Sequence, residues 1–85
     1  MSDAIDGILA EVRAELHHAT AKFAPMVSDR EGFDVIDEEV DELKLAIRWG
    51  VDHRGNPANP RDEAIQLAAM AVRFIYDVSD REAKP

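Results

Sequence analysis

Apolar residues recur every three or four positions in three stretches of the chain, a period that predicts three amphipathic helices. The first helix is expected over residues 4–24. Its apolar stripe consists of Ile5, Ile8, Leu9, Val12, Leu16, Ala19 and Phe23. Pro25 ends this helix, because a proline disfavours helical geometry in the residue before it. A short turn then leads to the second stretch.

The second helix is expected over residues 29–49, with a clear signal at each end. Ser28 and Glu31 have the spacing of a capping box, in which the hydroxyl and the carboxylate bind free backbone N–H groups. Gly50 fits the left-handed position that follows many helices. The pattern predicts a core stripe on this helix: Phe33, Ile36, Val40, Leu43 and Ile47.

A second row runs beside that stripe and contains Val35, Glu39, Glu42, Ala46 and Trp49. Glu39 and Glu42 are therefore expected at the border of the buried face and not on the solvent side. Asp34, Asp37 and Asp41 lie further round the helix, where bases are close by in the sequence. Solvation and salt bridges account for these three aspartates.

The third helix is expected over residues 60–79, after an irregular loop at residues 50–59 that is rich in turn formers. Asn59 is placed to cap it, with Pro60 at its first position. From residue 64 to residue 76 this helix is apolar nearly all round, with Gln66 and Arg73 as exceptions. Such a helix belongs at the centre of a protein.

Length and composition indicate one all-α domain over residues 1–85, built from three main helices that form a bundle. A chain of 85 residues buries a marginal core, and it contains no cysteine that could reinforce it. We therefore expect the bundle to be completed by oligomerisation, as a homodimer or homotetramer, through the apolar faces of the first and third helices. The start shows no secretion signal, and the longest apolar run is too short to span a bilayer, so we expect a cytoplasmic protein without a membrane partner.

The acidity of the chain is concentrated in one segment. Residues 29–42 hold eight acids and one base, so this segment carries nearly all of the chain's formal net charge of −8. Such a segment repels phosphate backbones, so we expect no nucleic-acid partner.

Glu39 and Glu42 have no base three or four residues away, and each pair of like charges at this spacing costs roughly 0.2–0.5 kcal/mol. A divalent cation would relieve the repulsion, and carboxylate ligands suit Mg²⁺ or Mn²⁺. Glu63 and Gln66 repeat the spacing on the third helix, so antiparallel packing would set two pairs of oxygen ligands face to face. The alternative is that these acids only solvate a helix surface, which for Glu38 is the simpler interpretation.

These residues resemble the signature of the MazG-like all-α nucleoside triphosphate pyrophosphohydrolases. That signature is EExxE followed, after a variable gap, by ExxD on the next helix. Here Glu38-Glu39-x-x-Glu42 precedes Glu63-x-x-Gln66 by 20 residues. The flanks are similar to small, phage-type members of the family: Lys22-Phe23, Ser28-x-x-Glu31-Gly32-Phe33, and the run from Glu63 to Phe74. The resemblance covers about residues 22–77.

The resemblance implies Mg²⁺-dependent hydrolysis of (deoxy)nucleoside triphosphates to a monophosphate and pyrophosphate. It implies that Glu39, Glu42 and Glu63 bind the metal, with Gln66 in the fourth position, where the family has aspartate. A glutamine there keeps a carbonyl oxygen but removes one charge. Glu38 is the candidate for a second-metal ligand or a water-orienting base.

Lys22 and Arg73 are candidates for contacts with the substrate phosphates. For Arg73 and Gln66 the sequence also offers structural roles. Arg73 is spaced to pair with Asp77, and Gln66 would serve as a core glutamine bonded across a helix interface. A different function also stays open. The chain would then be a non-catalytic interaction or metal-binding module that keeps the fold, with Gln66 marking the lost activity.

Overall fold

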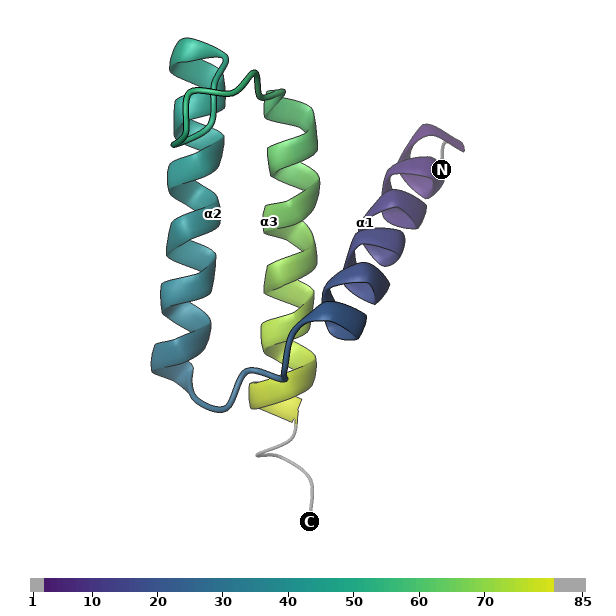
Figure 1. Ribbon diagram of the computed structural model, residues 1–85. Helices are drawn as coiled ribbons and strands as arrows, with labels where there is room; N and C mark the ends of the chain where they lie inside the picture. The colour runs from purple at the N-terminus through teal and green to yellow at the C-terminus, as the bar shows by residue number, and fades with distance from the viewer. Residues whose placement is uncertain (1–2, 81–85) are drawn as a thin grey trace.

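The computed structural model describes residues 3–80 as a chain of helices (Figure 1). Helix α1 spans Asp3–Lys22, α2 spans Asp29–Trp49 and α3 spans Pro60–Phe74. A π-helical segment, η1 (Ile75–Ser79), continues α3 without a break. No β-strand occurs within the described residues, so the all-α prediction is confirmed.

Helix α3 lies at the centre and packs against both of the others. Helices α2 and α3 run antiparallel side by side, whereas α1 leans on the other side of α3 and diverges from it toward the N-terminus (Figure 1). The principal extents of 45 × 33 × 20 Å describe a flat arrangement, about two helix diameters deep at most. The central position predicted for the third helix is confirmed.

The helix ends follow the local signals in the sequence. The Ser28 hydroxyl oxygen accepts a hydrogen bond of 3.1 Å from the backbone N–H of Glu31. Gly50, with φ of 68°, ends α2 in the left-handed conformation. The side-chain oxygen of Asn59 accepts a bond of 2.7 Å from the N–H of Arg61 at the start of α3. The bounds predicted for α2 are therefore confirmed, while α1 ends two residues before the predicted position.

The face of α2 that meets α3 differs from the prediction. Phe33 and Ile47, expected in the core, are each 64% exposed. The adjacent row, with buried Ala46, is the one that turns toward α3. The reason is steric: small residues let two helices approach closely. Gly32 lies on this side as well, against the ring of Phe74.

A buried ion pair fastens the connection between α1 and α2 to the end of α3. Arg73 and Asp77 are 4% and 6% exposed, and their Nε and Oδ2 atoms lie 3.3 Å apart. Asp77 Oδ2 also accepts a 2.9 Å hydrogen bond from the backbone N–H of Met26. Arg73 Nη2 donates to the carbonyls of Phe23, at 3.3 Å, and Ala24. The ion pair with Asp77, which the sequence offered as the structural alternative for Arg73, is present.

The hydrophobic core is small. Its buried apolar members are Ala19, Met26, Ala46, Ala69, Met70 and Val78. Three of the six are alanines, so little side-chain volume is removed from water. Across residues 3–80 none of the helices combines the length and the apolar character needed to cross a membrane.

Candidate functional site

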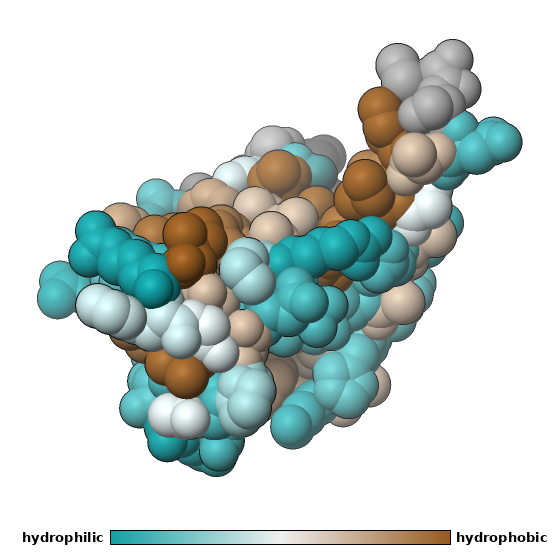
Figure 2. Space-filling view, turned by 90° about the horizontal axis from the view of Figure 1, so that it is seen from above, coloured by the Kyte–Doolittle hydropathy of each residue, from teal (hydrophilic) through white to brown (hydrophobic). Residues whose placement is uncertain are grey.

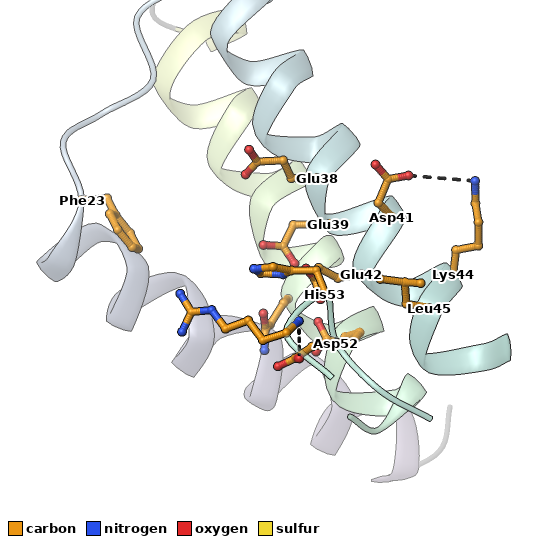
Figure 3. A pocket seen from close by; sticks show the side chains of 12 residues that line it. Phe23, Glu38, Glu39, Asp41, Glu42, Lys44, Leu45, Asp52 and His53 are labelled. Atoms are coloured by element: carbon orange, nitrogen blue, oxygen red, sulfur yellow. Dashed lines mark hydrogen bonds and ion pairs between the residues drawn. The ribbon is translucent and has the colours of Figure 1, made fainter. Parts of the chain in front are cut away.

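An open cleft of about 990 Å³ lies between α2, the loop at residues 50–59 and the first turns of α3 (Figure 3). The end of α1 borders it through Phe23. Five of the residues singled out in the sequence line this cleft: Glu38, Glu39, Glu42, Glu63 and Gln66. The antiparallel packing of α2 and α3 therefore brings the two spaced pairs together, as their spacing predicted.

The position of each acid follows from its helix. Glu39 and Glu42 lie on the row of α2 that turns toward α3, and both are half-buried. Glu63 is in the first turn of α3, with Gln66 one turn further on, and these two are also half-buried. Glu38 is exposed at the mouth of the cleft.

Glu39 is the most perturbed group of the cleft. Burial, followed by the charges of Glu63, Glu42 and Glu38, raises the pKa of Glu39 to about 7. A further contribution comes from Glu15 on α1. The Oε2 atom of Glu39 is buried and has no hydrogen-bond partner among the described residues. A buried oxygen without a partner is costly, so this atom marks a place where a ligand would stabilise the fold.

Glu63 is perturbed in the same direction. Burial raises the pKa of Glu63 first, and the charges of Glu42 and Asp52 add to the effect. In both groups burial is the largest cause, and the neighbouring carboxylates add to it. A cation is the simplest complement to such a site.

The loop between α2 and α3 supplies residues that sequence reasoning missed. The Asp52 carboxylate accepts hydrogen bonds from the backbone N–H groups of Arg54, at 2.8 Å, and Asn56, at 3.0 Å. This turn, with Gly55 at φ of 83°, folds the loop back on itself. As a result His53 and Arg54 line the cleft, and His53 Nδ1 contacts Glu42 Oε1 (Figure 3).

A signal for this arrangement was present in the sequence. Asp52, Gly55 and Asn56 are turn formers, and a tight turn directly after α2 must stay near the end of that helix. Periodicity gives no information about such a loop, so the pattern predicts only a connection between two helices.

The two basic residues proposed for phosphate contact do not line the cleft. Lys22 is exposed, and its Nζ atom lies 5.4 Å from the centre of the Phe23 ring. Arg73 is buried and engaged by Asp77 and two backbone carbonyls. The structure thus gives Arg73 a structural role, and substrate contact by either residue stays a prediction.

The carboxylates do not yet form a coordination sphere. Within residues 3–80 no three His, Asp or Glu side chains stand in an arrangement that could hold a metal ion. The residues nevertheless fit such an ion, because the orphaned oxygen of Glu39 lies among the charges of Glu42 and Glu63. Glutamate side chains reach different points by rotation about three bonds, which is how these oxygens would converge.

No family model, curated protein or solved structure matches this chain.

Proposed function

We propose that this protein hydrolyses (deoxy)nucleoside triphosphates to a monophosphate and pyrophosphate in the presence of Mg²⁺, as a MazG-like pyrophosphohydrolase. The observation that carries the proposal is the buried, unpartnered Oε2 of Glu39, surrounded by further carboxylates. The order of the acidic motifs along α2 and α3 supports the same assignment.

Glu39, Glu42 and Glu63 would hold the cation, with the carbonyl oxygen of Gln66 as a neutral fourth ligand. Oxygen ligands of this kind suit Mg²⁺, and Mn²⁺ is an alternative. When bound, the ion neutralises the carboxylates and polarises the phosphate oxygens of the substrate. Without that compensation the acidic cleft repels a triphosphate.

Other residues of the chain bind and orient the substrate. Glu38, an exposed residue that lines the cleft, would orient a water molecule and accept its proton. Arg54 provides a positive charge on the loop side, where it would bind phosphate oxygens. The ring of Phe23, 56% exposed at the border of the cleft, offers an apolar surface to a nucleobase.

The active form in this proposal is a homodimer or homotetramer. The small core and the many exposed apolar side chains support this part, because a single chain leaves much of its apolar surface in water.

A second candidate is a non-catalytic module that keeps the fold and binds a partner or a metal ion. Two observations favour it. Gln66 brings no charge to the cleft, which disfavours catalysis, and the contact of His53 with an oxygen of Glu42 favours the partner-binding form over the metal-binding one.

The test is a panel of nucleoside and deoxynucleoside triphosphates incubated with the purified protein and Mg²⁺ or Mn²⁺. The proposal predicts monophosphate and pyrophosphate in equal amounts from at least one substrate. No product from any substrate, together with no thermal shift on adding metal, would reject it. A thermal shift without product would favour the metal-binding module.

A further inference from the structure

Two glutamates lie one helical turn apart on α1, and their surroundings differ. Glu11 is exposed, and its carboxylate accepts hydrogen bonds of 2.8 and 2.5 Å from the guanidinium of Arg61. Glu15 is half-buried, and within residues 3–80 no basic side chain forms an ion pair with it. The ion pair accounts for Glu11, whereas the partial burial of Glu15 is costly and has no such compensation.

Contacts at both ends of the interface between α1 and α3 fix which residues lie side by side. At the start of α3 the contact is the ion pair just described, and near the end Arg73 donates a 3.3 Å hydrogen bond to the carbonyl of Phe23. Each contact joins residues that are 50 positions apart. Because α1 and α3 run in the same direction (Figure 1), this offset holds between the two contacts. Glu15 is therefore level with residue 65, next to Gln66.

The lining of a second cavity agrees with this register. The cavity has a volume of about 410 Å³ and lies between α1 and α3. Its lining residues are Glu11, Ala14, Glu15, Asp62, Ile65 and Gln66. Gln66 also lines the acidic cleft, so the two spaces meet at this one side chain.

Glu15 also acts on the acidic cleft through its charge. Burial is the largest cause of the raised pKa of Glu39, and Glu15 is among the carboxylates that add to it. Such an effect falls off with distance, so Glu15 and Glu39 lie near each other. Gln66 is the one neutral side chain among the half-buried polar residues of α2 and α3 that line the cleft, the others being Glu39, Glu42 and Glu63.

We propose that Glu15 supplies a fourth carboxylate to the Mg²⁺ site, beside Gln66, which brings no charge. This inference rests on the metal site proposed above, and it adds α1 to the two helices that hold the ion. A glutamate reaches different points by rotation about three bonds, so the side chain of Glu15 has the freedom that a ligand needs. The number of charged oxygen ligands in turn sets the affinity for the ion.

Helix α1 would gain a firmer attachment from such a bond. Ala19 is the buried residue of this helix. Figure 2 shows the N-terminal part of α1 projecting from the other helices, with Ile5 and Ile8 exposed there. A bond from Glu15 to an ion held by α2 and α3 would join α1 to both, so metal binding should slow the local opening of α1.

Calorimetric titration of the metal-free protein with Mg²⁺ and Mn²⁺ tests the proposal without a substrate. Glu15→Gln should weaken metal binding about tenfold, because it removes one charged ligand. Glu15→Asp keeps the charge but draws the carboxylate back by one carbon atom. It should therefore also weaken binding, by at least about threefold. Circular dichroism checks that both variants keep their helices.

Asp62→Asn is the matched control. Asp62 is exposed and lines the same cavity, and its charge acts on Glu63 as that of Glu15 acts on Glu39. Removing this charge alters the field at the site without removing a ligand, so metal binding should weaken by less than about twofold. Glu39→Gln is the reference for loss of the site and should abolish metal binding.

Hydrogen exchange of the backbone gives a second measurement. Addition of Mg²⁺ should slow the exchange of residues 10–18 at least about threefold in the wild type and leave it unaltered in Glu15→Gln.

Wild-type affinity in Glu15→Gln, or in Glu15→Asp, would overturn the role of Glu15. If Glu39→Gln lost metal binding in the same series, the site on α2 and α3 would still stand. Exchange of residues 10–18 that does not respond to Mg²⁺ would likewise reject the bond from α1. Absence of metal binding by every protein, the wild type included, would reject both this inference and the function on which it rests.

Discussion

Glu39 lies where burial and the neighbouring carboxylates disfavour its ionised form. The folded chain raises the pKa of this carboxyl from 4.5 to about 7, so between these values the folded state keeps a proton that the unfolded state has released. Unfolding then releases a proton, and the free energy of unfolding falls as the pH rises through this window. In the absence of divalent cations, the protein should be more stable at pH 5 than at pH 8.

Glu39→Gln should reduce this pH dependence, leaving the part that comes from Glu63, and should be more stable than the wild type at pH 8. The gain should be about 1–2 kcal/mol, a value reduced for solvent screening because the group is only half-buried. Urea unfolding of both proteins at the two pH values measures it. Asp34→Asn removes one charge from the exposed side of the same helix and serves as the control. If both variants changed equally, the environment assigned to Glu39 would be wrong.

Replacing Gln66 with aspartate should strengthen metal binding and lower the stability of the metal-free protein. Gln66→Asp adds a charged ligand and should tighten Mg²⁺ binding about tenfold. The same charge, placed among Glu39, Glu42 and Glu63, should lower the melting temperature without metal. Calorimetric titration and a thermal melt measure the two effects. An unaltered affinity would mean that this side chain does not face the ion.

At the scale of the helices, the contact between α2 and α3 depends on residue 32 being a glycine, which has no side chain. A Cβ atom built there overlaps the ring of Phe74. Gly32→Ala should therefore destabilise the protein by about 1–3 kcal/mol, although alanine is the better helix former. Gly7→Ala on α1 is the matched control, because a Cβ there meets nothing within 4 Å, and it should stabilise by up to about 1 kcal/mol. A stabilising Gly32→Ala would show that the ring moves freely.

The same contact explains what the sequence could and could not predict. Ser28, Gly50 and Asn59 act through bonds to near neighbours, so the helix ends could be located from the sequence. Two rows of α2 contain apolar residues, and periodicity alone does not say which one meets α3. That choice depends on the fit of Gly32 to Phe74, two residues far apart in the sequence.

The candidate site likewise has a part that the sequence could predict and a part that it could not. The four positions on α2 and α3 follow from helical spacing and antiparallel packing, and they line one cleft. The places of His53 and Arg54 depend on the turn made by Asp52, and this turn has no periodic signal. The burial of Arg73 likewise depends on carbonyls of the distant segment between α1 and α2.

At the scale of the whole molecule, the core is small, so the proposed association would contribute to stability. If the folded chain is paired, its melting temperature should rise with protein concentration, by about 2–4 °C for each tenfold increase. Differential scanning calorimetry over a hundredfold range measures this rise. A melting temperature independent of concentration would show that the single chain is stable alone.

The carboxylates between α2 and α3 are proposed to act together on a nucleoside triphosphate. The most direct measurement is the rate of pyrophosphate release in Mg²⁺ by the wild type, by Glu39→Gln and by the surface control Asp34→Asn. The proposed function predicts release by the wild type and the control, and a loss of at least about 100-fold in kcat/KM for Glu39→Gln with its fold intact. Equal rates for all three proteins, or no release by any of them, would contradict it.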